Sequence, residues 1–315
     1  MVVLTRAEVE ELLDLDVLVD AVADALRDLS EGRASMPPRI AALVPEQDGL
    51  LGAMPAYLPD ACLAVKLVSL FPRNRDRNTH QATIMVFDHA NGTPVALMDG
   101  SYITATRTAA ASALATRLLA REGSRTLAIV GTGVQARSHA RALVRVRDFE
   151  EVRVVGRDPA RTRALAEELG ARACSTYEEA LSGADVVTAT THSVEPVVRY
   201  EWLAPGAHVN SVGLNPQGRE VDNRTVENAA LYVESRSSAL APPPAGAPEL
   251  VGVDASRAIE LGELVAGTAP GRTGPDQITL YKSVGVAVED AAAAALVLKA
   301  AGERGLGLEI QLEEL

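Results

Sequence analysis

The chain has 315 residues, enough for one large or two medium domains with substantial cores. Hydrophobic residues make up 47% and charged residues 23%, as in a typical globular protein. The net charge of −12 argues against nonspecific binding to nucleic acid, because phosphate backbones attract basic surfaces. Charged residues interrupt the longest Ala-rich stretches, and the N-terminus lacks a signal-peptide core. We therefore expect a cytoplasmic protein that binds no membrane.

The first part of the chain predicts short helices followed by strands. Thr5 and Glu8 form the capping-box pattern of a helix start. Asp16 is expected to cap a second helix over Val17–Leu29, and Met36-Pro37-Pro38 is expected to stop it. The apolar runs after it predict strands at Ile40–Val44, Leu50–Ala56, Ala64–Leu70 and Thr83–Asp88.

A hairpin signal follows these strands. Asn91-Gly92 separates the run Thr83–Ala90 from the run Pro94–Met98, and this dipeptide favours a tight turn between antiparallel strands. The first part is therefore predicted to be an α+β domain with an antiparallel or mixed sheet.

From residue 104 onward, strands and helices alternate. An Ala/Leu-rich helix is predicted at Thr104–Ala120, a second helix after a glycine turn to about Val146, and a third at Pro159–Leu169. Strands are predicted at Thr126–Val130, Val152–Val155, Ala184–Ala189, His208–Val212 and Ala230–Val233, with a final helix from about Val284 to Ala301. This alternation predicts a Rossmann-type, doubly wound parallel sheet, so the fold class is α/β with an additional α+β domain.

The two cysteines, Cys62 and Cys174, lie far apart in the sequence. Such a pair is a poor disulfide framework, so we expect reduced thiols. No clustered Cys/His spacing typical of a metal site is present, and no metal is predicted.

A dinucleotide-binding motif follows the predicted strand Thr126–Val130. The sequence Gly131-Thr132-Gly133-Val134-Gln135-Ala136 matches G-x-G-x-x-A and precedes a predicted helix. The first glycine permits the tight turn, the second lets the backbone approach a pyrophosphate, and the helix N-terminus offers N–H groups to it. We therefore assign cofactor binding to Gly131, Thr132, Gly133, Val134 and Gln135; the alternative is a glycine turn in a ligand-free domain.

The residues after the second strand of this unit bear on the choice of cofactor. NAD sites usually carry an acidic residue there, whereas this chain has Gly156 followed by Arg157. Since an Arg pairs with a 2′-phosphate, NADP(H) is favoured, with Arg157 as its contact. Asp158 is expected to cap the helix that begins at Pro159. If Asp158 turned toward the ribose instead, the cofactor would be NAD(H).

Five segments together resemble the ornithine cyclodeaminase/mu-crystallin family, in the same order and over nearly the whole chain. They are Met54–Tyr57, Thr104–Ala110, Gly131–Arg137, Asn210–Gly213 and Ile278–Gly285. The resemblance implies a homodimer with a substrate-binding and dimerisation domain (1–122 with 285–315) and a Rossmann domain (123–284). It also implies an NAD(P)-dependent oxidoreductase acting on a small imino or amino acid.

The resemblance further implies that Arg39, Lys66 and Arg107 hold the substrate carboxylate. Arg offers a planar fork that matches a carboxylate, and Lys a point charge. Each residue also has a structural interpretation: Arg39 as a solvated residue at a strand start, and Lys66 as an edge-strand lysine. Arg107 lies in the first turn of a helix, where the macrodipole disfavours a cation, which supports a binding role.

Other positions in the family-like segments are expected near the cofactor. These are Thr190, Val212, Gly213, Ser283 and Gly285, where helix capping by Thr190 and a helix start at Ser283 are the structural alternatives. His80 matches a family pattern near the site and His139 is expected to pack on the first Rossmann helix. Neither is predicted to be catalytic.

Two departures argue against ornithine cyclisation. Cyclodeaminases carry carboxylates at the positions of Asn215 and Gly52, and neither an amide nor a glycine acts as a base. The sequence instead favours reduction of an imino acid by NADPH, or its reverse, with Lys66 as proton relay and Asn215 orienting the substrate nitrogen. A cyclodeaminase-type ammonia lyase and a ligand-binding protein are the alternatives.

Overall fold

The computed structural model describes residues 1–59 and 61–311, and the chain divides into two compact units. Unit 1 comprises Met1–Arg107 and Val286–Leu315, and unit 2 comprises Thr108–Gly285. The division falls inside helix α3 (Gly100–Leu119), whereas the boundary predicted from the sequence lay after residue 122. The first turns of α3 belong to unit 1, where Arg107 hydrogen-bonds residues of the C-terminal helix.

Within the described residues, unit 1 contains a seven-stranded mixed sheet in the order β15-β1-β6-β5-β4-β3-β2. Its strands are β1 (Val2–Leu4), β2 (Ile40–Val44), β3 (Gly49–Leu58), β4 (Cys62–Leu70), β5 (His80–Phe87), β6 (Pro94–Asp99) and β15 (Leu308–Glu309). β1 and β6 run parallel and the other neighbours antiparallel. The hairpin predicted at Asn91-Gly92 is confirmed, since β5 pairs with β6 and Gly92 adopts a φ of 80°.

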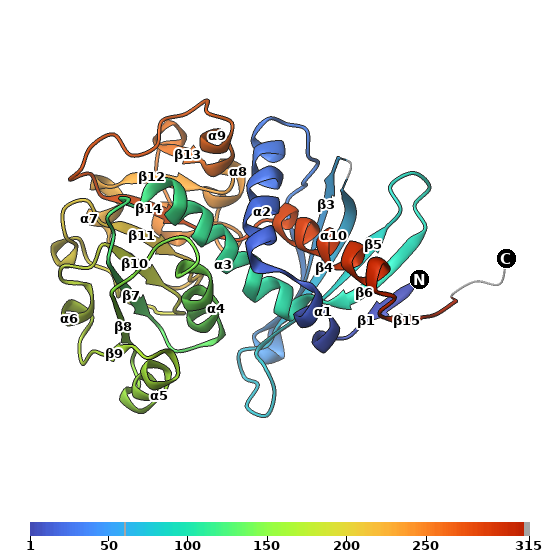
Figure 1. Cartoon of the computed structure of the whole chain (residues 1–315), viewed down its shortest axis with the longest axis horizontal. Helices are drawn as coiled ribbons and strands as arrows, with labels where there is room; N and C mark the ends of the chain where they lie inside the picture. Colours follow the sequence, from blue (N-terminus) through green and yellow to red (C-terminus); the bar gives the residue numbers. More distant parts are fainter. Residues whose placement is uncertain (60, 312–315) are drawn as a thin grey trace. The chain divides into compact units, whose positions relative to one another are not determined.

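The helices of unit 1 are α1 (Arg6–Leu12), α2 (Leu15–Ser30), the first turns of α3, α10 (Ala287–Arg304) and the short 3-10 helix η1 (Pro45–Gln47). α10 packs against α2, β3 and β4 (Figure 1). The capping box of Thr5 and Glu8 is confirmed, with the Thr5 N–H donating to the Glu8 carboxylate at 2.7 Å.

Two predictions about α2 were wrong. Asp14 caps the helix, because its carboxylate accepts from the N–H groups of Asp16 at 2.8 Å and Val17 at 3.1 Å; Asp16 lies in the first turn. The helix also ends at Ser30, before Met36-Pro37-Pro38. Gly32, with a φ of 72°, supplies the left-handed residue that turns the chain away.

Unit 2 contains, within the described residues, an eight-stranded parallel sheet in the order β13-β12-β14-β11-β10-β7-β8-β9, which Figure 1 shows with its strands side by side. The strands are β7 (Thr126–Val130), β8 (Glu151–Val155), β9 (Arg172–Ala173), β10 (Val186–Ala189), β11 (His208–Ser211), β12 (Ala230–Val233), β13 (Ala258–Glu260) and β14 (Thr279–Lys282). The prediction of a doubly wound parallel sheet is confirmed. The chain order reverses between β7 and β10, and such switch points are where ligands bind in open α/β sheets.

The helices of unit 2 follow the predicted alternation. Besides the rest of α3 they are α4 (Val134–Leu143), α5 (Pro159–Leu169), α6 (Tyr177–Leu181), α7 (Asn223–Asn228), α8 (Arg236–Ala239), α9 (Leu261–Val265) and the 3-10 helices η2 (Tyr200–Trp202), η3 (Pro248–Leu250) and η4 (Ala255–Arg257). None of the helices in residues 1–59 and 61–311 combines the length and hydropathy that a bilayer crossing requires.

Candidate active site

The glycine loop after β7 has the backbone that a dinucleotide site needs. Gly131 adopts a φ of 121°, and a Cβ there would lie 2.5 Å from the Thr190 hydroxyl oxygen. A Cβ on Gly133, in contrast, would meet no atom within 4 Å, so the backbone is open to approach from that side. The first glycine therefore serves the turn and the second leaves room for a ligand.

Thr190 holds this loop from the neighbouring strand. Its hydroxyl donates to the Val130 carbonyl at 3.0 Å and its N–H to the same oxygen at 2.9 Å. Thr190 does not cap a helix, because β10 is followed by an irregular segment up to η2. The residue thus ties the ends of β7 and β10 together at the switch point of the sheet.

The N-terminus of α4 is open to an anion. Gly133 occupies the N-cap position and supplies no side-chain acceptor for the first N–H groups, while Val134 is exposed. Among the described residues, the buried Oε1 atom of Gln135 has no hydrogen-bond partner; as an acceptor it suits a hydroxyl donor of a ligand and not a phosphate. These features fit a dinucleotide whose pyrophosphate accepts the free N–H groups of the loop and helix.

The residues after β8 offer no free carboxylate. Asp158 caps α5, as predicted, and accepts from the N–H groups of Ala160 at 2.9 Å and Arg161 at 3.2 Å. A Cβ on Gly156 would lie 2.8 Å from the Thr132 methyl carbon, so a larger residue there would displace the glycine loop. Arg157 is exposed next to it.

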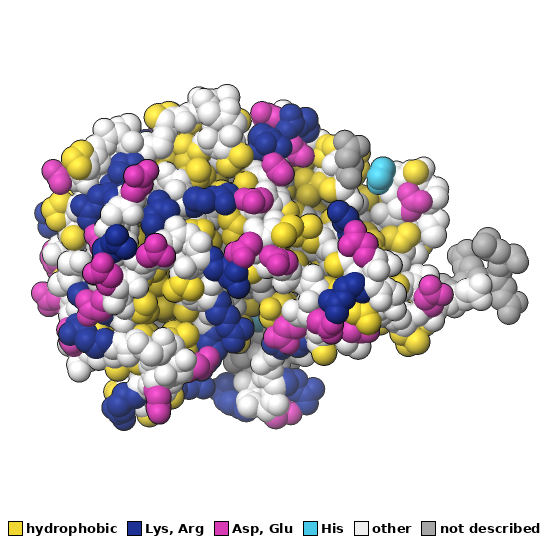
Figure 2. All heavy atoms as spheres, viewed as in Figure 1, with side chains coloured by type: hydrophobic (Ala, Val, Ile, Leu, Met, Phe, Trp, Pro, Cys, Tyr) yellow, Lys and Arg dark blue, Asp and Glu magenta, His cyan; other side chains and the backbone are white. Residues whose placement is uncertain are grey.

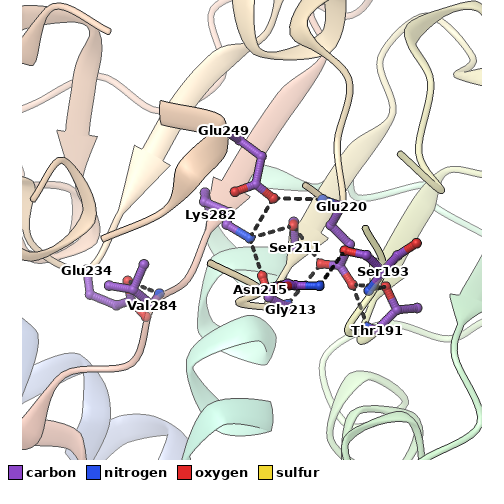
Figure 3. A network of polar contacts seen from close by, with 10 residues as sticks. All are labelled: Thr191, Ser193, Ser211, Gly213, Asn215, Glu220, Glu234, Glu249, Lys282 and Val284. Atoms are coloured by element: carbon purple, nitrogen blue, oxygen red, sulfur yellow. Dashed lines mark hydrogen bonds and ion pairs between the residues drawn. The ribbon is translucent and has the colours of Figure 1, made fainter. Parts of the chain in front are cut away.

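Buried charged side chains connect the C-terminal ends of β10, β11 and β14 (Figure 3). Glu220 accepts from the Thr191 N–H at 2.5 Å and hydroxyl at 2.8 Å, and also from Ser211 Oγ at 2.8 Å and the Gly213 N–H at 2.9 Å. A Cβ on Gly213 would lie 2.0 Å from the Thr191 carbonyl oxygen and 2.5 Å from Glu220 Oε1. Glu220 thus clamps two strand-end loops, and only glycine fits at 213.

Lys282, at the end of β14, supports the same loops. Its ammonium donates to the Gly213 carbonyl at 2.5 Å and to Ser211 Oγ at 3.1 Å, and it lies 3.2 Å from Glu249 Oε1. Glu249 in turn accepts from the Glu220 N–H at 2.8 Å. The Val212 N–H donates to the Ala189 carbonyl at 3.0 Å, which adds a backbone bond between β11 and β10.

Glu234 organises the segment before α10. This buried carboxylate, directly after β12, accepts from Ser283 Oγ at 2.5 Å and from the N–H groups of Gly285 at 3.0 Å and Val284 at 3.3 Å. Gly285 has a φ of 70°. Because these residues form a turn on Glu234, α10 begins at Ala287 and not at Val284 as predicted.

Asn215 binds backbone on both sides of its amide. Its Nδ2 donates to the carbonyls of His192 and Ser193, each at 3.3 Å, and its Oδ1 accepts from the Gln217 N–H at 3.0 Å. A role in orienting the substrate nitrogen would require these bonds to open, so that role stays a prediction.

A second buried cluster lies in unit 1, on the face of the sheet that α10 covers. Lys66, in β4, is 2% exposed, and its ammonium lies 2.6 Å from Asp290 of α10. Arg107 lies beyond the first turn of α3, which begins at Gly100, so its predicted position in a first turn was wrong. It donates through Nε to Asp290 at 3.0 Å and through Nη1 to Glu289 at 2.6 Å. Lys66 is therefore a buried, paired lysine in an inner strand, and the edge-strand interpretation was wrong.

The electrostatics of the cluster favour a mobile proton on Lys66. Burial lowers the pKa of Lys66 from 10.5 to about 8; Asp290 opposes this shift, while the charges of Arg107 and Arg39 add to it. Burial raises the pKa of Asp290, but the charges of Arg107 and Lys66 outweigh it, so that pKa is lowered. Desolvation by the surrounding protein lowers the pKa of His80 to about 4, and the charges of Lys66 and Arg107 contribute, so His80 is neutral at pH 7.

The remaining candidates have structural contacts. His139 is buried on α4, as expected, between Ser112 Oγ at 2.9 Å and the Gln135 carbonyl at 2.7 Å. Cys62 and Cys174 are buried free thiols, in accord with the expectation of reduced cysteines. In residues 1–59 and 61–311, no group of three or more His, Cys, Asp and Glu side chains is placed to hold a metal ion.

The carboxylates of both clusters were not predicted from the sequence. Glu289 and Asp290 read as ordinary acidic residues in the first turn of an Ala-rich helix. Glu220 and Glu234 lie in irregular or strand-end segments and Glu249 lies in the short 3-10 helix η3, with no motif around them. The available signal was the two lysines within apolar strands, Lys66 and Lys282, because each needs a buried anion.

Comparison with known proteins agrees with these features. The model of the ornithine cyclodeaminase/mu-crystallin family matches residues 1–305. Ketimine reductase mu-crystallin of Mus musculus is 40% identical over 93% of this chain and 95% of its own. The Thermococcus litoralis Delta(1)-pyrroline-2-carboxylate reductase, solved with NADH and L-proline, is 35% identical, with a TM-score of 0.92 over 98% of this chain and 100% of its own. An archaeal alanine dehydrogenase dimer with bound NAD has 32% identity and a TM-score of 0.91 over 99% of each chain. The chain belongs to the ornithine cyclodeaminase/mu-crystallin family.

Proposed function

We propose that this protein is an NAD(P)-dependent oxidoreductase that reduces the C=N bond of a small imino acid, or catalyses the reverse oxidation of the amine. The buried cluster of Lys66, Arg107, Glu289 and Asp290 supports this proposal most strongly. The named relatives above include a ketimine reductase and a reductase whose structure contains NADH and L-proline, and both names fit this reaction class.

The charges of the cluster suit a substrate with one carboxylate. Lys66 and Arg107 balance Glu289 and Asp290, and Arg39 lies close enough to lower the pKa of Lys66. With Arg39 included, the cluster has one net positive charge when Lys66 is protonated. An isolated anion is costly to bury, so a site with one excess cation favours a monocarboxylate.

In this proposal the side chains of unit 1 bind the substrate and move the proton. The dinucleotide, when bound, supplies or accepts the hydride. Arg39 and Arg107 hold the substrate carboxylate, and Lys66 donates a proton to the substrate nitrogen during reduction. A pKa of about 8 leaves Lys66 mostly protonated at pH 7 and still able to release its proton.

Unit 2 fits a nicotinamide dinucleotide, and we propose a preference for NADP(H). The support is the absence of a carboxylate at Gly156, the use of Asp158 as a helix cap, and the exposed Arg157. The two solved relatives named above hold NADH and NAD, so the preference is tested by comparing the rates with NADPH and with NADH. A higher kcat/KM with NADPH, lost in Arg157→Ala, is expected; a higher value with NADH in the unaltered protein would reject the preference.

Cyclodeamination fits the geometry less well. Gly52 lies within β3, where a Cβ would be 3.3 Å from a Val68 methyl carbon, so there is little room for a longer side chain. Asn215 provides no carboxylate for a second amino group. We therefore propose the reductase chemistry over the lyase chemistry.

We also propose a homodimer in which unit 1 pairs through the outer face of its sheet. Helix α10 packs on the inner face, whereas Ile40, Leu51 and Leu67 on the outer face are 70, 50 and 39% exposed. The strand register places Ile40 beside Ala53 and Ala53 beside Leu67, so the apolar residues are contiguous. A Leu51→Lys variant should sediment as a monomer. If the parent protein without this substitution also sedimented as a monomer, the proposal would be rejected.

The test of function is the loss of NADPH or NADH absorbance with a panel of substrates. The panel contains cyclic ketimine acids, and pyruvate, glyoxylate or oxaloacetate with ammonia or methylamine. We expect turnover with imino acids that carry one carboxylate, at a pH near 7. Release of ammonia from ornithine or lysine without net change of cofactor would identify a lyase, and cofactor binding without any turnover would favour a ligand-binding protein.

The surface fits this small-molecule role. Figure 2 shows Lys and Arg side chains interspersed with Asp and Glu over the face that it draws. On that face the basic residues do not form one broad patch of the kind that nucleic-acid binding uses.

A further inference from the structure

Two adjacent carboxylates at the start of α10 have different partners. Glu289 and Asp290 are both buried, at 0 and 2% exposure. Asp290 contacts two cations, with Oδ1 3.0 Å from Arg107 Nε and Oδ2 2.6 Å from Lys66 Nζ. Glu289 forms an ion pair with Arg107, with its Oε2 atom 2.6 Å from Arg107 Nη1. The two residues therefore form a natural pair of test and control.

The location of Asp290 makes it the main anion acting on Lys66. The titratable groups that interact with this lysine come from four elements or segments. They are Asp290 on α10, Arg107 on α3, Arg39 before β2, and His80 on β5, which is uncharged near pH 7. In the described part of the chain, Asp290 is thus the carboxylate that pairs directly with the Lys66 ammonium, and it opposes the charges of Arg107 and Arg39.

We propose that Asp290 is a positioning residue that keeps Lys66 protonated and aimed, and so sets the pH range in which Lys66 delivers its proton. Without Asp290, Lys66 would lose the carboxylate that it contacts and would still face the charges of Arg107 and Arg39 in a buried site, so it would lose its proton at lower pH. The catalytic part of this inference rests on the proposed function; the protonation part does not.

The lysine content of the chain allows a direct measurement. The sequence has three lysines, Lys66, Lys282 and Lys299. Protein labelled with 13C at the lysine Cε gives three resonances, and Lys66→Met identifies that of Lys66. Lys299, with a side chain 75% exposed, serves as the solvated reference in the same spectrum.

The expected result is a difference between the two neighbouring variants. In Asp290→Asn, the titration midpoint of Lys66 should fall by about one pH unit or more, because an opposite charge in direct contact has been removed. In Glu289→Gln, the midpoint should stay near that of the parent protein, because Glu289 pairs with Arg107. Equal midpoints in the parent and Asp290→Asn, or equal shifts in both variants, would overturn the proposal.

A charge-preserving variant covers the case in which Asp290→Asn does not fold. Asp290→Glu retains the carboxylate on a chain one methylene longer, so the Lys66 midpoint should remain closer to that of the parent than to that of free lysine. A midpoint near 10.5 in this variant would show that Asp290 does not set the protonation of Lys66.

Kinetics provide the second readout. For reduction, the alkaline limb of kcat/KM should move to lower pH in Asp290→Asn and keep its position in Glu289→Gln, even if Glu289→Gln raises KM through Arg107. A shifted NMR midpoint with an unmoved alkaline limb would reject Lys66 as the proton donor while leaving its pairing with Asp290 intact. No turnover in any protein, with a normal NMR result, would reject the proposed function alone.

Discussion

The two buried lysines of this chain occupy different kinds of site. Lys282 in unit 2 donates to the Gly213 carbonyl and Ser211 hydroxyl and pairs with Glu249, so its ammonium is surrounded by acceptors from strand ends. Lys66 in unit 1 pairs with Asp290 but is repelled by Arg107 and Arg39, which lower its pKa along with burial. The burial of a lysine alone therefore does not indicate whether its role is structural or functional.

The difference lies in the balance of charge around each lysine. Lys282 is held by neutral dipoles and an anion, an arrangement that stabilises the strand ends and leaves no charge for a ligand. Around Lys66, cations outnumber anions once Arg39 is counted, so an anionic substrate improves the balance. We infer that Lys66 serves chemistry and Lys282 serves architecture, and the following variants test that contrast.

The largest expected effect is on catalysis in unit 1. Lys66→Met should lower kcat/KM for imine reduction by about 10²–10⁴-fold, the usual contribution of a proton donor. The dissociation constant of this variant for NADPH, measured by fluorescence titration, should stay unchanged because the proposed cofactor residues lie in unit 2. Asp290 keeps Arg107 as a partner, so the protein should remain folded. Normal turnover in this variant would assign the proton to another group.

The corresponding variant in unit 2 should mainly affect stability. Lys282→Met leaves Glu249 buried without its cation, and breaking a buried pair from one side costs about 3–5 kcal/mol. The single tryptophan, Trp202, lies in unit 2, so its fluorescence during urea unfolding reports on the affected unit. If Lys282→Met lost less than about 1 kcal/mol in its free energy of unfolding, or less than Lys66→Met loses, the structural role assigned to Lys282 would be wrong.

The sequence predicted the scaffold of both units better than the ion pairs within them. The motif Gly131–Ala136, the strand Thr126–Val130 and the helix Pro159–Leu169 depend on local periodicity and turn chemistry, and they were confirmed. The strand β14 was not predicted, although it lies between β12 and β11, because Thr279 and Lys282 at its ends leave no continuous apolar run. Glu220 and Asp290 were missed because their partners come from other strands and helices, which no spacing in one sequence reveals.

Buried histidines extend the contrast to acid pH. Burial lowers the pKa of His208 to about 3 and that of His139 to about 4, from 6.5. The folded state therefore favours the neutral ring, so stability is complete above pH 6.5 and falls as the pH decreases toward 4 and 3. At pH 5, each ring should cost about 2 kcal/mol relative to pH 7. His139→Gln should show a smaller loss of unit 2 stability between pH 7 and 5, measured by Trp202; an unchanged loss would mean that His139 is already protonated or solvated.

The smallest expected effect distinguishes a carboxylate near the proposed cofactor site from one at the opposite end of the sheet. Glu220 binds the loops at the C-terminal ends of β10 and β11, whereas Asp185 accepts from the N–H groups of Arg125 at 2.8 Å and Thr126 at 3.0 Å at the opposite end of the sheet. Both Glu220→Gln and Asp185→Asn should lower the urea midpoint of unit 2, because each loses charge-assisted hydrogen bonds. Only Glu220→Gln should raise the KM for the dinucleotide, by about tenfold, since an amide cannot accept on both sides and the loop carrying Val212 and Gly213 would shift. If both variants raised this KM equally, the effect would be a general loosening of the sheet; if neither did, the loop at Gly213 would not contact the cofactor.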